Sequence, residues 1–277
     1  MYRRRPRIIL VVRKGLPLFL ILVTVLGGAA GTYLAWGMPK PVVNDRFYWE
    51  QTGAAVWDGR VSEPLIALTF DDGPDPDFTP QVLTVLREFK VKATFFMVGN
   101  LVEAYPEVAR EVATEGHEIG NHTYSHPSLT RIDAGELRQE LIRADRVITA
   151  ITGQQPRLFR PPGGYYDETV ISTARDLGYR VVIWSWKQDT KDWGNPGARG
   201  IVRRVLQNAR PGDIILLHDG GGNRSQTVQA LAPLLTELQK REFKLVTVSE
   251  LLQHDQRQME RAGARPIPDG KPERPER

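Results

Sequence analysis

The chain has 277 residues and no cysteine, with 41% hydrophobic and 25% charged residues. This composition excludes wholesale disorder, and the lack of cysteine excludes a disulfide scaffold, a thiolate metal site and a cysteine nucleophile. The formal charge of +4 lies mainly in residues 1–61, with nine Lys and Arg against three Asp and Glu, whereas residues 62–253 have 22 against 25. We therefore expect no nucleic-acid partner, because such domains carry a basic excess on the folded part.

The N-terminal residues 1–36 predict a membrane-targeting segment. Basic residues between Arg3 and Lys14 precede an uncharged stretch whose apolar centre spans 16–36. That length is close to the ~20 residues with which a helix crosses a bilayer. The preceding positive charge predicts a cytoplasmic N-terminus and an extracytoplasmic location for the rest of the chain. We expect an uncleaved, single-pass signal anchor in the cell membrane, with a cleaved signal peptide and secretion as the alternative.

Two further segments flank the predicted domain. Residues 37–61 mix Pro, Gly, Asn and Trp without periodicity, which indicates a stalk or linker. Residues 254–277 are polar and rich in proline, which is typical of a disordered tail. The folded domain is therefore expected over 62–253.

Short apolar runs and amphipathic segments alternate through this domain. The apolar runs predict strands over 65–70, 92–98, 117–121, 157–159, 179–186, 213–218 and 244–248. The amphipathic segments predict helices over 79–89, 106–115, 133–152, 167–178, 198–209 and 225–240, the first with Thr79 as its N-cap. About seven such units predict an α/β fold with a parallel sheet and outer helices. No G-x-G-x-x-G follows the first strand, so we favour a closed or nearly closed barrel over a Rossmann sheet.

Two motifs at predicted strand ends carry the strongest chemical signal. TFDDGP places Asp71 and Asp72 where the first strand turns, although Asp-Gly and Gly-Pro are also ordinary turn residues. HTYSH places His122 and His126 at i and i+4, the spacing of one face of a helical turn. With one carboxylate, this pair makes a His₂Asp site with open positions, which is typical of a catalytic zinc or related metal.

Three further polar motifs follow later strands, and each alone is open to a purely structural interpretation. RPPGG supplies Arg160 and a backbone-exposed loop, and DTKDW supplies Asp192 and Trp193. LLHD supplies His218, which can transfer a proton near neutral pH. In a parallel barrel the C-terminal strand ends share one rim, so all five motifs are expected to meet there.

In their order and spacing, TFDDGP, HTYSH, RPPGG, DTKDW and LLH resemble the five motifs of polysaccharide deacetylases, carbohydrate esterase family 4, whose domain is of the nodulation type. The resemblance covers about 62–253. It implies a distorted (β/α)7 barrel and metal-dependent removal of acetyl groups from N-acetylated sugars. The metal is expected to be zinc, with cobalt or another divalent ion as alternatives.

The resemblance also implies a role for each motif residue. Asp71 corresponds to the general base, held by Arg160, and His218 to the general acid, oriented by Asp192. The metal ligands correspond to Asp72, His122 and His126. The Gly163 N–H corresponds to the oxyanion donor, and Trp193 and Leu216 to the walls of the acetyl pocket. Many relatives carry a bulky residue in place of Gly163, and here Tyr165 and Tyr166 are expected to fill that space, with Tyr165 binding substrate.

The resulting hypothesis is a membrane-anchored, monomeric deacetylase acting on N-acetylglucosamine of peptidoglycan. Chitooligosaccharide deacetylation and acetylxylan esterase activity are alternatives within the enzyme class. A catalytically silent wall-binding module is the alternative outside it, but the base and all three metal ligands are present. A glycosidase using Asp71 and Asp72 is disfavoured, because adjacent residues on a turn cannot readily flank a glycosidic bond at ~5–9.5 Å.

Overall fold

The computed structural model describes residues 46–261 and 263. The predicted signal anchor over 1–36 therefore lies outside the described residues, as does most of the predicted tail. Within the described part of the chain, no helix combines the length and apolar character needed to cross a bilayer.

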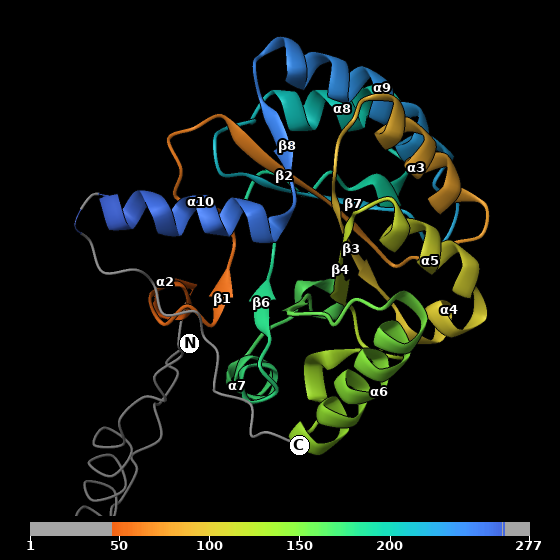
Figure 1. The fold of residues 1–277 in the computed structure, drawn as a ribbon, viewed down its shortest axis with the longest axis vertical. Coiled ribbons are helices and arrows are strands. Elements are labelled where there is room, and N and C mark those ends of the chain that lie inside the picture. Colours follow the sequence, from red (N-terminus) through yellow and green to blue (C-terminus); the bar gives the residue numbers. More distant parts are fainter. Residues whose placement is uncertain (1–45, 262, 264–277) are drawn as a thin grey trace, which may run out of the picture. The chain divides into compact units, whose positions relative to one another are not determined.

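A parallel sheet curls through the centre of the described domain, with helices around its outside (Figure 1). Its strands are β1 (Ala55–Val56), β2 (Leu65–Asp71), β3 (Thr94–Met97), β4 (Glu118–Asn121), β5 (Leu158–Phe159), β6 (Arg180–Val182), β7 (Ile214–His218) and β8 (Lys244–Val246). They pair in the order β1-β6-β5-β4-β3-β2-β7, and β8 also pairs with β2. All these pairings are parallel, so the predicted α/β class is confirmed, and the curled sheet fits a distorted (β/α)7 barrel.

Among the described residues, one helix precedes the first strand, and the others lie after β2 along the chain. The helices are α2 (Arg46–Gln51), α3 (Phe78–Glu88), α4 (Gly99–Ala104), α5 (Pro106–Thr114), α6 (Ala134–Thr152), α7 (Glu168–Asp176), α8 (Ala198–Leu206), α9 (Ser225–Lys240) and α10 (Val248–Arg261). Helix α4 was not predicted, and the predicted N-cap of α3 was wrong. Asp77 occupies that position, and the Thr79 hydroxyl instead donates to the side chain of Asp219 at 2.6 Å.

Strand β2 shows how alternation builds the two sides of the sheet. Ile66, Leu68 and Phe70 belong to the core that the outer helices α3 and α9 share. Leu65 and Ala67 belong to a second core inside the barrel. Because successive strand residues point to opposite faces, Thr69 and Asp71 continue the inner row. This row thus changes from apolar to polar at the C-terminal end of the strand.

Strand β7 repeats this alternation beside β2. Ile215 and Leu217 pack outward against the helices, while Ile214 lies in the inner core. Leu216 and His218 then line a cavity at the rim. Asp71 and His218 are register partners, so the alternation of two adjacent strands brings the first and fifth motifs together.

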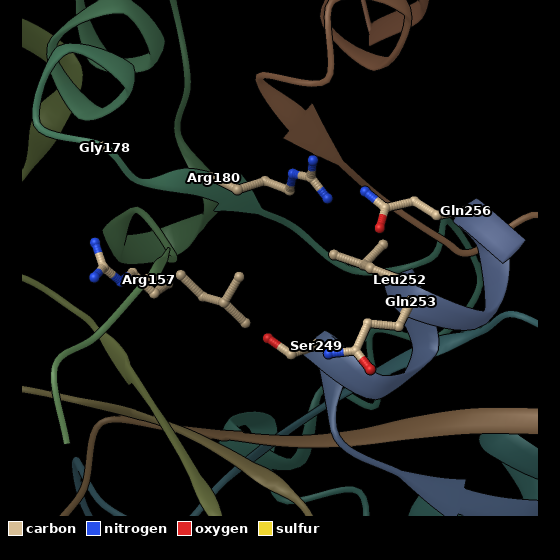
Figure 2. Close-up of a pocket in the computed structure, with 8 residues that line it drawn as sticks. Arg157, Gly178, Arg180, Ser249, Leu252, Gln253 and Gln256 are labelled. Carbon is tan, nitrogen blue, oxygen red and sulfur yellow. The ribbon is translucent and has the colours of Figure 1, made fainter. Parts of the chain in front are cut away.

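Helix α10 lies at the opposite, N-terminal end of the barrel. Val248, Leu251 and Leu252 pack into the inner core. A cleft of about 270 Å³ separates α10 from the starts of β5 and β6, and Arg180 reaches across it toward Gln256 (Figure 2). None of the five motifs contributes to this cleft, so the predicted chemistry belongs to the rim alone.

The folded domain extends beyond both predicted boundaries. Residues 46–61, expected as linker, contain α2 and β1, and β1 pairs with β6. Trp49 and Trp57 are buried in the core that also contains Phe159 and Val181. At the other end, α10 continues to Arg261, so the predicted tail cannot begin at 254. The apolar spacing of Val248, Leu251 and Leu252 was the signal for that helix.

Candidate active site

The five motifs meet at one cavity of about 300 Å³ at the C-terminal rim. It is lined by Asp71, Asp72, His122, His126, Gly163, Trp184, Asp189, Trp193, Leu216 and His218. Eight of these ten were predicted from the sequence as site residues. The cavity is therefore polar on the side of the carboxylates and histidines and apolar at the tryptophans and leucine.

Asp71 is held from behind by Arg160. Both side chains are buried, and the Arg160 Nη1 atom donates to Asp71 Oδ1 at 2.7 Å. The same Nη1 atom donates to Thr69 at 2.7 Å, one step down the inner row of β2. The other carboxylate oxygen, Oδ2, lies 3.9 Å from His122 Nε2. Arg160 thus occupies one oxygen of Asp71 and leaves the other facing the histidine cluster.

The arginine itself is held by backbone acceptors. Its Nε atom donates to the carbonyl of Val182 at 3.2 Å, and Nη2 donates to that of Ile183 at 2.8 Å. The guanidinium also lies 4.1 Å from the ring centroid of Phe96. Burial lowers the pKa of Arg160, and the carboxylate of Asp71 opposes that shift.

Asp72, His122 and His126 bring one ligand atom each within 4.8 Å of one another. Asp72 Oδ1 lies 3.4 Å from His122 Nε2 and 3.2 Å from His126 Nε2. Ligand atoms at ~2.0–2.1 Å around a tetrahedral zinc are separated by roughly 3.3 Å. These spacings therefore fit a divalent metal bound by the three side chains.

The tautomer of His122 supports the same fit. Its Nδ1 atom lies 2.7 Å from the carbonyl oxygen of Arg160, which can only accept a hydrogen bond. The proton is thereby placed on Nδ1, and the lone pair of Nε2 faces Asp72, as in metal-ligating histidines. Burial disfavours the charged form of Asp72, but the neighbouring imidazoles of His122 and His126 outweigh it and hold the pKa of Asp72 far below the ordinary value. The hydrogen bond to Asp72 raises the pKa of His126.

The predicted helical turn at HTYSH is absent, although its two histidines do meet. Residues 122–126 form a loop in which Thr123 and His126 have φ values of 67° and 55°. The Asn121 side chain accepts from the Thr123 N–H at 2.8 Å. Glu140 Oε2 accepts from the N–H groups of Tyr124 and Ser125. A hydrogen-bonded loop, rather than helical periodicity, thus brings the imidazoles to a centroid separation of 5.0 Å.

His218 and Asp192 form the second buried pair at the rim. His218 Nδ1 lies 2.7 Å from Asp192 Oδ1, while the His218 backbone N–H and the Thr227 hydroxyl donate to Oδ2. Burial disfavours both charged forms, but their mutual interaction outweighs it. The pKa of His218 is therefore raised and that of Asp192 lowered. Since Nδ1 is engaged, Nε2 is the nitrogen available for proton transfer.

The predicted substrate-binding residues separate into two groups. Trp193, 59% exposed, and buried Leu216 both line the cavity. Gly163 also lines it and has φ 63°. Tyr165 is not among the lining residues and packs against the core that includes Phe159. It does not fill the space at Gly163, and a role for Tyr165 in substrate binding stays a prediction.

Trp184 was not predicted as a cavity residue, because it was placed inside a predicted strand, whereas the strand ends at Val182.

A glycine-rich loop that covers Asp72 from behind was also not predicted. Arg224 donates to the carbonyls of Gly220 and Gly221, and its Nη2 atom lies 4.0 Å from Asp72 Oδ2. A Cβ atom on Gly221 would lie 2.7 Å from that same oxygen. The signal was the run of glycines directly after His218.

One cavity on a curled parallel barrel is thus lined by a cluster of two histidines with an aspartate and by a histidine paired with a second aspartate. This combination defines a metal-assisted hydrolase site. Comparison with known proteins agrees with this class. Residues 58–182 match the family model described as Polysaccharide deacetylase. A peptidoglycan-N-acetylglucosamine deacetylase of Bacillus cereus is 49% identical over 205 residues, which cover 74% of this chain and 96% of the relative.

Two further similarities extend the comparison. A chitooligosaccharide deacetylase of a Bradyrhizobium species is 41% identical over 67% of this chain and 90% of its own length. A crystal structure of a peptidoglycan N-acetylglucosamine deacetylase is 36% identical, with a TM-score of 0.72 over 76% of this chain and 97% of that one. The chain therefore belongs to the polysaccharide deacetylases of carbohydrate esterase family 4, and its predicted assignment as a hydrolase of that family is confirmed.

Proposed function

We propose that this chain removes the N-acetyl group from N-acetylglucosamine residues of peptidoglycan. The observation that carries the reaction is the placement of Asp71 and His218 on adjacent strands, both facing the cavity that Asp72, His122 and His126 line. The 49% identity to the Bacillus cereus enzyme supports the choice of substrate.

Asp71 acts as the general base in this proposal. Its Oδ1 atom is engaged by Arg160, whereas Oδ2 faces the cluster of metal ligands. A carboxylate held in this way has one oxygen free to accept a proton from an attacking water. Arg160 prevents the side chain from rotating away during that transfer.

Asp72, His122 and His126 would hold the metal, and we propose zinc. A divalent metal there supplies Lewis-acid polarisation of the acetyl carbonyl. The short loop after β2 carries Asp72 with φ 71°, which turns its carboxylate to the histidines while its neighbour Asp71 faces Arg160. Adjacent carboxylates thereby serve two roles.

His218 acts as the general acid. Asp192 accepts a hydrogen bond from Nδ1–H and keeps Nε2 directed to the cavity, where Nε2 protonates the departing amine. The Gly163 N–H is proposed to stabilise the oxyanion that develops on the acetyl oxygen. Trp193 and Leu216 supply the apolar surface for the acetyl methyl group.

Acetate release tests this proposal directly. The full chain is incubated with zinc and with peptidoglycan, chitooligosaccharide or acetylxylan, and a sample stripped of metal by a chelator serves as the control. We expect release from peptidoglycan that is lost after chelation and restored by zinc. Absence of release from all three polymers would exclude the deacetylase function.

Chitooligosaccharide is the second candidate substrate, supported by the 41% identity to the Bradyrhizobium enzyme. Both polymers present N-acetylglucosamine, so the same residues would act on either. Mass spectrometry of the products separates the two, because the preferred polymer loses acetyl groups at the lower enzyme concentration.

We also propose that residues 1–36 anchor the enzyme in the cell membrane with the catalytic domain outside. The uncharged stretch over 16–36 and the basic residues before it support this orientation. Fractionation of cells tests it, with N-terminal sequencing of the mature protein. A soluble product that starts after residue 36 would instead establish a cleaved signal peptide.

A further inference from the structure

The RPPGG loop that carries Gly163 is pressed against the indole of Trp184. We propose that Trp184 is a positioning residue, which holds Gly164 and thereby sets the place of the Gly163 N–H in the cavity. This inference rests on the proposed function, in which that N–H stabilises the oxyanion. Trp184 belongs to none of the five motifs, and the sequence places it inside a predicted strand.

The two consecutive glycines of this loop face different surroundings. A Cβ atom on Gly164 would lie 2.3 Å from Trp184 Cη2 and 2.7 Å from Cζ3. A Cβ atom on Gly163 would have nothing within 4 Å. Both have positive φ values, of 69° and 63°. Gly164 therefore provides close contact with the indole, whereas Gly163 leaves open space on the side of the cavity.

The position of the indole relative to the loop is fixed, because Arg160 holds both the loop and the backbone that leads to Trp184. Arg160 begins the loop, and its guanidinium donates to the carbonyls of Val182 and Ile183, the two residues before Trp184. Within the loop, the Gly164 N–H donates to the carbonyl of Pro161 at 2.9 Å. The indole thus rests on a segment that cannot shift without also disturbing the partner of Asp71.

Trp184 also lines the cavity, so a role as a platform for the sugar ring is the competing interpretation. The two roles differ in kinetics. An oxyanion donor acts in the transition state, and its displacement lowers kcat, whereas loss of a uniform binding surface raises KM with kcat unchanged. Loss of one oxyanion donor typically costs 10²–10³-fold in kcat.

The first experiment compares Trp184→Ala and Trp184→Phe with Trp186→Ala in the full, zinc-loaded chain. Trp186 is two residues away, 85% exposed and absent from the cavity lining. We expect kcat to fall by about 10- to 100-fold in Trp184→Ala, with less loss in Trp184→Phe and little in Trp186→Ala. A KM increase with unchanged kcat, or no change in Trp184→Ala, would overturn the proposal.

A double-mutant cycle tests the contact itself. Gly164→Ala places a methyl group into the indole, and Gly153→Ala is its control, because Gly153 has φ 72° but open space around its Cβ position. We expect Gly164→Ala to lower kcat and thermal stability in the parent chain and to cost less in the Trp184→Ala background. If the effects of the two substitutions on kcat and on thermal stability are additive, the contact between Gly164 and Trp184 does not position the loop.

These outcomes separate the inference from the proposed function. If the parent chain releases no acetate, both fail together. If the parent chain releases acetate and Trp184→Ala matches it, the positioning role alone fails. Thermal unfolding of each variant ensures that a loss of kcat is measured on folded protein.

Discussion

Two buried carboxylates at the rim are held by cations at the same distance but in different chemical settings. Asp71 lies 2.7 Å from Arg160, whose charge is permanent and whose side chain is fully enclosed. Asp192 lies 2.7 Å from His218, whose side chain retains 12% exposure at the cavity and whose charge is titratable. In the proposed mechanism, the first pair keeps a proton acceptor in place, while the second keeps a proton donor available.

The difference follows from where each pair sits. Arg160 reaches its partner through the barrel interior and donates its other hydrogen bonds to the Thr69 hydroxyl and two backbone carbonyls. His218 stands at the end of β7, with Nδ1 toward Asp192 and the rest of the ring toward the cavity. A general base needs a fixed geometry, and a general acid needs access and a tuned pKa. In the proposed mechanism, the rim provides the base and the acid at separate strand ends.

Asp71→Asn should produce the largest effect, because it removes the proposed general base and retains the shape of the side chain. An amide cannot accept the proton, so we expect kcat for acetate release to fall by about 10²–10⁴-fold. Zinc binding, followed by titration against a chromophoric chelator, should change little because Asp72, His122 and His126 remain. If the variant still releases acetate, Asp71 is not required as the base, and the contrast between the Asp71–Arg160 and Asp192–His218 pairs fails.

Arg160→Lys should combine a loss of activity with a loss of stability. Lysine keeps one charge but cannot donate to Asp71, Thr69 and two carbonyls together. Removing one partner of a buried ion pair costs ~3–5 kcal/mol, and we expect somewhat less here because the charge remains. Urea unfolding measures the stability change. Arg241→Lys is the control, since Arg241 is exposed and donates to the Leu206 carbonyl.

That control also defines the result that would contradict the assignment. If Arg160→Lys and Arg241→Lys shift the urea midpoint equally, the guanidinium of Arg160 is not specifically required. If stability falls but kcat for acetate release is unchanged, Arg160 supports the fold without positioning Asp71.

The sequence predicted the rim better than the boundaries of the domain. Strands β2 and β7 each have continuous apolar runs ending in acidic or histidine residues, so both the strands and their chemistry could be identified. Strand β1 has only two residues, Ala55 and Val56, too few for a periodic pattern. Its place in the sheet depends on pairing with β6 and on burial of Trp49 and Trp57, which are properties of the tertiary structure.

Local spacing was a poorer guide inside the site. His122 and His126 were placed correctly at a common site, but by the wrong geometry, because hydrogen bonds donated by the loop backbone to the distant Glu140 side chain shape that loop. Trp184 and Arg224 were missed, since their roles depend on chain segments returning to Gly164 and Asp72. Motif residues could thus be predicted, while the residues that support them required the folded chain.

Asp192→Asn should have a smaller effect on activity and a distinctive effect on its pH dependence. Burial lowers the pKa of His218, and Asp192 more than offsets this, so the variant should have a lower His218 pKa. A general acid is lost as pH rises through its pKa, and the high-pH limb of the rate profile should therefore move to lower pH. We expect about a 10- to 100-fold loss of kcat/KM near neutral pH. An unmoved high-pH limb would show that Asp192 does not tune the acid.

His117 shows the behaviour of a buried histidine whose neighbours do not overcome burial. Its side chain is 1% exposed, and its Nδ1 atom accepts from the Ala93 N–H at 3.1 Å. Burial lowers its pKa to about 4, Lys92 adds to this shift, and Glu115 at 3.8 Å opposes it. The comparison with His218 shows how a carboxylate at 2.7 Å changes the pKa of a buried histidine.

This contrast predicts a specific loss of stability in acid. Between the ordinary pKa near 6.5 and the folded value of about 4, the unfolded chain binds more protons at His117 than the folded chain does. The free energy of unfolding therefore falls as pH drops through this range, by at most about 2 kcal/mol between pH 6.5 and 5. Urea unfolding of the parent chain and His117→Asn at pH 7 and 5 measures this, with His254→Asn as the control at a half-exposed histidine beside Glu63. The parent and the His254→Asn chain should lose more stability on acidification than His117→Asn does. Equal losses in all three would mean that His117 is protonated as readily in the folded protein as in the unfolded chain.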